Sequence, residues 1–218
     1  MKRLRLAPFG AAVLLLCGAV CLRAQDKDVA PPGATEKQAA STPARQESSA
    51  TKRARATPIE KPGLPNLHRV SDDLYRGAQP TAEGIRQLKA MGIRTVINLR
   101  SLHSDRDEIG KTALAYEHIP METWDPEGKD VVRFLKLVAD KDRTPVFVHC
   151  QHGADRTGTM CAIYRLAVQG WTKEEAIDEM TNGGFGFHKI WQNLVRYVRN
   201  LDVEHIKKQA GLSKPVPP

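Results

Sequence analysis

The sequence predicts an α/β domain with a central, mostly parallel sheet flanked by helices. Between residues 64 and 209, short β-branched and apolar runs alternate with stretches that have the apolar spacing of amphipathic helices. The chain then ends in a group of helical patterns. Alternating strands and helices favour parallel strands joined by helices that pack on the sheet. The segment is long enough to bury the core of one ordinary domain.

The first part of the chain predicts export. Three basic residues precede an apolar stretch that ends near Ala24, which is the pattern of a secretory signal peptide over residues 1–24. We therefore expect a secreted or periplasmic protein, anchored in the membrane only if the peptide stays uncleaved. The apolar stretch is short for a spanning helix, so no stable membrane span is expected after cleavage.

Residues 25–63 are rich in small, polar and charged residues, and this composition predicts a disordered linker. Residues 1–62 hold 11 Lys and Arg against 5 Asp and Glu, whereas the remainder holds 22 against 20. The overall charge of +8 thus belongs mostly to leader and linker, and nucleic-acid binding by the domain is not implied. Residues 210–218 are expected to form a flexible tail, and the protein to be a monomer.

The elements of the domain follow from turn residues and apolar spacing. Two short strands, 67–70 and 74–77, surround the Ser71-Asp72-Asp73 turn. Thr81 caps a helix that ends at Gly92, and the β-branched run 93–99 is a buried strand. The later elements are expected as a short helix ending at Ala115, a strand at 118–121, a loop at 124–130, a helix at 131–138, a strand at 145–148, a helix at 157–168, a helix opened by the Thr172/Glu175 capping box, a loop at 182–186 and a long helix at 190–206.

The stretch from His149 to Gly158 carries the chemistry. Cys150 opens a loop and Arg156 closes it, between an apolar strand and a helix. A tight loop that leads into a helix N-terminus turns backbone N–H groups inward and makes a cradle for an anion. The positive environment favours the thiolate form of Cys150, and Arg156 offers a planar fork for two phosphate oxygens. The alternative is a buried structural cysteine beside a capping arginine.

The motif Cys-x5-Arg-Thr-Gly after an apolar strand resembles the signature loop of cysteine-dependent protein tyrosine and dual-specificity phosphatases. The resemblance implies a protein tyrosine phosphatase-like fold and hydrolysis of a phosphorylated protein or small phosphomonoester, chiefly phosphotyrosine, without metal or cofactor. It implies a phosphocysteine on Cys150, stabilised by Arg156, with Thr157 helping the sulfur leave and His149 orienting the loop. The implied phosphate-binding residues are Gln151, His152, Gly153, Ala154, Asp155 and Arg156.

The leaving oxygen also needs a proton donor, which in this family is usually an aspartate on an upstream loop. Asp125, in the segment Trp124–Gly128, is the first candidate. Asp130 is the second, with helix capping as its alternative role. Asp155 is the third, although a carboxylate inside the cradle should repel phosphate unless it is protonated or turned outward.

Other interpretations stay open. The segment 74–80 resembles atypical dual-specificity phosphatases, some of which act on inositol pyrophosphates, yet the signature loop offers no lysine for a second phosphate. Arg76 and Arg100 extend the anion site or form surface salt bridges, and Phe185 lines the pocket mouth or packs in the core. A rhodanese-like sulfurtransferase and a non-catalytic phosphate-binding module are the competing functions.

Two cysteines remain after the expected cleavage, Cys150 and Cys161. We expect Cys161 to be a small core residue in the helix after the loop. The intervening loop and helix should hold the two sulfurs beyond disulfide reach.

Overall fold

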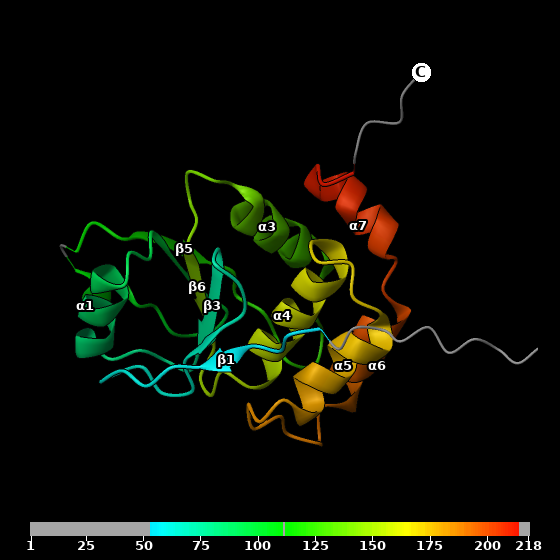
Figure 1. Cartoon of the computed structure of the whole chain (residues 1–218), viewed down its shortest axis with the longest axis horizontal. Coiled ribbons are helices and arrows are strands. Elements are labelled where there is room, and N and C mark those ends of the chain that lie inside the picture. The colour runs from blue at the N-terminus through cyan, green and yellow to red at the C-terminus, as the bar shows by residue number, and fades with distance from the viewer. Residues whose placement is uncertain (1–52, 111, 214–218) are drawn as a thin grey trace, which may run out of the picture. The chain divides into compact units, whose positions relative to one another are not determined.

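The computed structural model describes residues 53–110 and 112–213, which form a six-stranded sheet with helices around it (Figure 1). The expected signal peptide and residues 25–52 lie outside the described residues. The strands are β1 (Thr57–Pro58), β2 (His68–Arg69), β3 (Leu74–Gly77), β4 (Thr95–Asn98), β5 (Ala115–His118) and β6 (Val146–His149). The helices are α1 (Ala82–Ala90), α2 (Arg106–Ile109), α3 (Gly128–Ala139), α4 (Asp155–Ala167), α5 (Lys173–Asn182), α6 (Gln192–Asn200) and α7 (Val203–Ala210).

The sheet is mostly parallel, as the sequence predicted. Its order is β1-β2-β3-β6-β4-β5, with parallel pairing from β3 to β5 and antiparallel pairing of β1 and β2 at one edge. The strand β6 lies in the middle, where His149 is in register with Gly77 of β3 and Asn98 of β4. Residues that follow these three strands therefore meet at one edge of the sheet.

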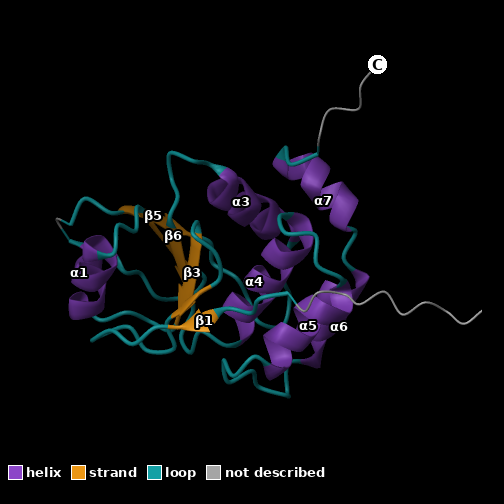
Figure 2. Cartoon of the chain, in the orientation of Figure 1, coloured by secondary structure: helices purple, strands orange, loops and turns teal. Residues whose placement is uncertain are grey.

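Both faces of the sheet are covered, as expected for buried parallel strands (Figure 2). Val146 and Val148 of β6 pack into the apolar cluster formed with α3–α7, whereas Phe147 between them packs with Ile85 and Leu88 of α1. The chain crosses from β3 through α1 to β4, and later returns through α3 from β5 to β6. Right-handed crossovers in opposite directions place their helices on opposite faces and leave a crevice at the strand ends between them.

The predicted boundaries of the short helix and of the strand within residues 108–121 were wrong. The short helix α2 ends at Ile109 rather than at Ala115, and the strand is Ala115–His118 rather than 118–121. This strand lies at the edge of the sheet and is only partly buried, so it lacks the apolar run of a central strand. The buried Ile119 and Met121 follow it and still donate backbone hydrogen bonds to the β4 side.

The long C-terminal helix was also predicted wrongly. It is two helices, α6 and α7, because Leu201 is extended and Asp202 caps the second helix by accepting from the N–H of His205 at 2.9 Å. Apolar spacing continues on both sides of this break and hides it from periodicity. The helices α3 and α4 begin slightly earlier than predicted, at Gly128 and Asp155, while the capping box of Thr172 and Glu175 is confirmed.

The described region begins before the expected boundary at residue 64, which is a correction to the linker prediction. Thr57 and Pro58 pair with β2, and the N–H of Ala56 donates to Glu179 Oε1 at 2.8 Å. This segment is held to the domain by backbone pairing and by one buried carboxylate. Since it has few apolar residues, its sequence does not show that it belongs to the domain. At the other end, α7 includes Ala210, so the helical part of the domain ends one residue later than the expected boundary at residue 209. None of the helices in the described part of the chain has the length and apolar character needed to cross a membrane.

Candidate active site

Cys150 lies at the end of the central strand β6, just before the loop that leads into α4. Its side chain is buried, and the thiols of Cys150 and Cys161 are both free, as the sequence predicted. Burial raises the pKa of the Cys161 thiol to about 11, so Cys161 stays protonated at neutral pH. Cys161 is therefore a core residue, and Cys150 is the cysteine at the functional edge of the sheet.

The loop from Gln151 to Ala154 turns its carbonyl groups toward neighbouring segments. The N–H of Gln79 donates to the carbonyl of Gln151 at 3.2 Å, and Asn66 Nδ2 donates to that of His152 at 2.9 Å. Within the described residues, no protein acceptor pairs with the N–H groups of residues 151–154. This arrangement leaves backbone N–H donors free at the loop, while their binding of an anion stays a prediction.

Gly153 lets the loop approach β3 closely. It has a φ of +70°, and a Cβ added there would lie 2.5 Å from the carbonyl carbon and oxygen of Gly77. The carbonyl of Gly153 accepts from Arg76 Nη2 at 2.7 Å, and the Arg76 guanidinium lies 3.6 Å over the ring of Phe185. Both of these side chains are buried. Arg76 therefore supports the loop from beneath, and Phe185 belongs to the core rather than to the pocket mouth.

Arg156 is the closing cation of the loop and lines a pocket of about 370 Å³ together with Gln151. Its Nη1 makes long hydrogen bonds, 3.4 Å each, to the carbonyls of Leu99 and Met121. These bonds hold the half-buried guanidinium at the carboxyl end of β4. The other residues that line the pocket are Arg100, Ser101, Leu102, His103, Glu122, Thr123 and Trp124.

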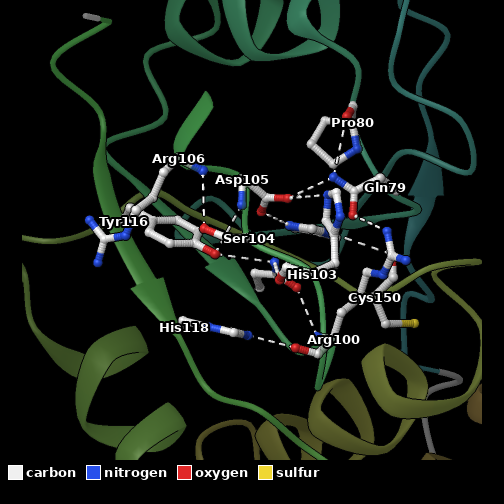
Figure 3. A network of polar contacts seen from close by, with 12 residues as sticks. Gln79, Pro80, Arg100, His103, Ser104, Asp105, Arg106, Tyr116, His118 and Cys150 are labelled. Atoms are coloured by element: carbon white, nitrogen blue, oxygen red, sulfur yellow. Dashed lines mark hydrogen bonds and ion pairs between the residues drawn. The ribbon is translucent and has the colours of Figure 1, made fainter. Parts of the chain in front are cut away.

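A buried polar network runs beside Cys150 (Figure 3). His149 Nε2 lies 2.7 Å from Asp105 Oδ2, and both side chains are inaccessible to solvent. Asp105 Oδ1 accepts from Gln79 Nε2 at 2.7 Å, and Gln79 Oε1 accepts from Arg100 Nη1 at 3.0 Å. The other imidazole nitrogen, Nδ1, lies 3.3 Å from the carbonyl of Cys150. The network thus links the residue before Cys150 to a cation in the pocket.

Asp105 is held as a carboxylate by its neighbours. Burial alone raises the pKa of its carboxyl group, but the hydrogen bond and charge of His149, followed by Gln79 and His103, lower the pKa below its usual range overall. Sequence reasoning expected His149 to orient the loop but missed its partner. Asp105 sits in a polar stretch with no motif, so only the fold shows that it faces β6.

The three aspartates considered as proton donors lie in different environments. Asp125 is exposed and lines a neighbouring pocket with α6, although the adjacent Trp124 lines both pockets. Asp130 is buried in the first turn of α3, where desolvation, followed by the charge of Glu127, raises its pKa. The carboxylate that does line the Arg156 pocket is Glu122, which sequence reasoning did not single out.

Asp155 is turned toward a different part of the chain. Its Oδ1 accepts from the backbone N–H of His188 at 2.9 Å, and its Oδ2 lies 2.8 Å from Nδ1 of the same histidine. This pairing ties the first turn of α4 to the segment after α5. The carboxylate is therefore engaged with His188 rather than free to meet a phosphate, which relieves the repulsion expected from its position in the loop.

Thr157 lies in the first turn of α4 with its side chain fully buried. Its Oγ1 has no hydrogen-bond partner among the described residues, the Cys150 sulfur included. A buried hydroxyl without a partner costs about 1–3 kcal/mol. The expected role beside the sulfur thus stays a prediction, and this hydroxyl is available to a group that forms during a reaction.

Comparison with known proteins gives one consistent family. A family model described as a DSP-PTPase phosphatase fused to NAD+ kinase matches residues 63–196. The dual specificity protein phosphatase TpbA of Pseudomonas aeruginosa is 34% identical over 143 residues, which make up 65% of this chain and 65% of that protein. The chain thus spans just under two thirds of the length of this relative.

A solved structure of TpbA and one plant relative extend the comparison. A crystal structure of Pseudomonas aeruginosa TpbA in complex with pTyr is 30% identical, with a TM-score of 0.65 over 76% of this chain and 100% of that chain. The inositol diphosphatase DSP5 of Arabidopsis thaliana is 27% identical and matches 66% of this chain and 73% of that protein. The predicted phosphatase-like fold is confirmed by the structural match.

Proposed function

The chain belongs to the DSP-PTPase phosphatase family whose model it matches, and from this premise we propose that it hydrolyses phosphomonoesters, phosphotyrosine above all. One observation supports this most. Cys150 follows a central parallel strand and opens a loop whose N–H groups have no acceptor among the described residues, and Arg156 closes that loop from within the adjoining pocket. A relative with the same fold was crystallised with pTyr.

The proposed reaction has two steps. The Cys150 thiolate attacks phosphorus, the bond from phosphorus to the leaving oxygen breaks, and an acidic side chain gives that oxygen its proton. Water then attacks the phosphocysteine, so that inorganic phosphate leaves and the thiolate returns. Arg156 and the loop N–H groups stabilise the equatorial oxygens where charge spreads in the transition state. Thr157 is proposed to aid the departure of sulfur in the second step.

The rim of the pocket favours an aryl ester. The side chain of Trp124 is 66% exposed and that of Leu102 is fully exposed, and both line the pocket that holds Arg156. An exposed aromatic side chain can stack on the ring of a phosphotyrosine and bury apolar area on both partners. We propose Asp125 as the proton donor, since catalytic contacts of a loop residue often form only with substrate bound.

Hydrolysis of p-nitrophenyl phosphate tests this function, with Cys161→Ser as the matched control for Cys150→Ser. We expect the wild type and Cys161→Ser to release phosphate without added metal, and Cys150→Ser to be inactive. An active Cys150→Ser variant would contradict the mechanism. A wild type that binds phosphate but turns nothing over would favour the non-catalytic module.

A second candidate function is hydrolysis of inositol phosphates. Its support is the relative named an inositol diphosphatase. Against it, the signature loop carries Gln151, His152, Ala154 and Asp155 and no lysine for further phosphates. Rates on a phosphotyrosine peptide and on an inositol polyphosphate, measured side by side, separate the two functions.

We also propose that the protein is exported to the periplasm or secreted. The support is the basic start and apolar stretch of residues 1–24. Expression of the full chain in a Gram-negative host, with fractionation and N-terminal sequencing, tests this. We expect a periplasmic product that begins near residue 25, and an uncleaved product in the cytoplasm would contradict the proposal.

A further inference from the structure

Arg100 is a cation without a carboxylate partner in the pocket that contains Arg156. Its guanidinium donates from Nη1 to Gln79 Oε1 at 3.0 Å, and it forms no ion pair within the described residues. The sequence left two roles open for Arg100, an extension of the anion site or a surface salt bridge. Since no carboxylate of the described chain pairs with it, the structure favours the first role.

The fold restricts the orientation of the Arg100 side chain. Gln79 follows β3 and Arg100 follows β4, so the parallel sheet brings both to the edge where Cys150 follows β6. The amide of Gln79 cannot turn over freely, because its Nε2 donates to Asp105 Oδ1 at 2.7 Å while its oxygen accepts from Arg100. Figure 3 shows this chain of contacts beside Cys150. A cation fixed in this way is ready to bind an anion at little entropic cost.

The charge of the pocket suits a substrate with one anionic group beyond the transferred phosphoryl group. Arg100 and Arg156 are its two arginines, and Glu122 is its one carboxylate among the lining residues. The signature loop supplies no lysine that would favour several further phosphates. The exposed apolar side chains of Trp124 and Leu102 at the same pocket suit an aromatic ring and the peptide that carries it.

We propose that Arg100 binds a carboxylate next to the phosphorylated residue, so that the preferred substrates are phosphotyrosine peptides with an adjacent acidic residue. This inference rests on the proposed phosphatase function. A half-exposed charge pair contributes about fivefold to affinity, and salt weakens it. Arg100 would thus select among substrates, whereas Arg156 acts on the transferred group.

The test compares two phosphotyrosine peptides that differ only in one neighbouring residue, Glu or Gln. The measured quantity is the ratio of their kcat/KM values, for wild type, Arg100→Gln, Arg100→Lys and Arg94→Gln. Arg94 is an exposed arginine at the opposite end of the same strand and serves as the matched control. We expect wild type and Arg94→Gln to prefer the Glu peptide about fivefold, Arg100→Lys to keep part of the preference, and Arg100→Gln to lose it. We also expect the wild-type preference to shrink as ionic strength rises.

Two results would overturn the inference while leaving the phosphatase function intact. The first is equal rates of the wild type on the two peptides. The second is a ratio that stays unchanged in Arg100→Gln, including the case in which the rates on both peptides fall equally. A preference of the wild type for a small diphosphate over the Glu peptide, abolished in Arg100→Gln, would assign the site to a second phosphate instead. No Cys150-dependent hydrolysis of either peptide would overturn the proposed function itself, and this inference with it.

Discussion

The Oδ2 atom of Asp105 lies 2.7 Å from Nε2 of His149, and neither side chain reaches solvent. The two residues come from a polar loop and from the central strand, 44 positions apart in the chain. A buried carboxylate is retained only where hydrogen bonds and charge offset its desolvation, and here His149 and Gln79 supply them. The pair fixes the imidazole of the residue that precedes Cys150.

The first prediction concerns this pair. Asp105→Asn replaces a buried carboxylate that is hydrogen-bonded to Gln79 and His149, and loss of a hydrogen bond to a charged group costs about 1.5–3 kcal/mol in the free energy of unfolding. We expect a loss of this order by urea denaturation, together with a lower kcat on p-nitrophenyl phosphate. Asp107→Asn, at an exposed position on α2, is the control and should stay within about 0.5 kcal/mol of wild type.

The same variant has a defined pH dependence. The folded pKa of Asp105 lies below its usual value of 3.8, so its ionised form stabilises the fold at all pH values above that range. The stabilisation is lost as pH falls through the lowered folded value. The difference between wild type and Asp105→Asn should therefore be constant from about pH 5 to 7 and shrink in stronger acid. A difference that grows as the solution is acidified would contradict this assignment.

The second prediction concerns the tight approach of the loop to β3. Gly153→Ala combines a left-handed conformation with a Cβ placed 2.5 Å from Gly77, whereas Gly170→Ala has a φ of +63° and open space around it. The left-handed conformation alone costs about 1–2 kcal/mol. We expect Gly170→Ala to lose only that much stability and to keep its activity, and Gly153→Ala to lose more stability and nearly all activity. Equal behaviour of the two variants would contradict the packing described.

The third prediction identifies the proton donor. Among Asp125→Asn, Asp130→Asn, Asp155→Asn and Glu122→Gln, we expect Asp125→Asn alone to lose the basic limb of the pH profile of kcat/KM. Asp130 is buried in the first turn of α3, and Asp155 is held by His188. Since Glu122 lines the pocket, loss of the basic limb in Glu122→Gln with a normal profile in Asp125→Asn would transfer the role to Glu122.

The fourth prediction concerns the start of the domain. A chain that begins at residue 64 lacks β1 and the hydrogen bond from Ala56 to Glu179, whose carboxylate also pairs with the buried Arg165 at 2.7 Å. We expect it to unfold about 1–3 kcal/mol more readily than a chain that begins at residue 53. The matched chain from residue 53 should equal the mature protein in stability. If both fragments are equally stable, β1 contributes nothing to the fold.

The sequence was most informative where one physical signal dominates. Apolar runs and cap residues located β4, β6 and the starts of α1 and α5, and the spacing from Cys150 to Arg156 located the loop. It failed at the edge strand β5, whose partial burial leaves no run, and at Asp202, where apolar spacing continues across a capped break. Asp105 and Glu122 carry no local signal at all. Their positions follow from strand order, which brings distant segments to one edge of the sheet.

The central claim is that Cys150 carries the phosphoryl group during turnover. Its most direct test is acid quench of the full chain during turnover of p-nitrophenyl phosphate, followed by mass spectrometry of the peptide that contains Cys150. We predict that this peptide gains the mass of one phosphoryl group, and that Cys150→Ser gains none while Cys161→Ser still does. Turnover at full rate with no phosphorylated Cys150 peptide, or with the group on another residue, would contradict the account.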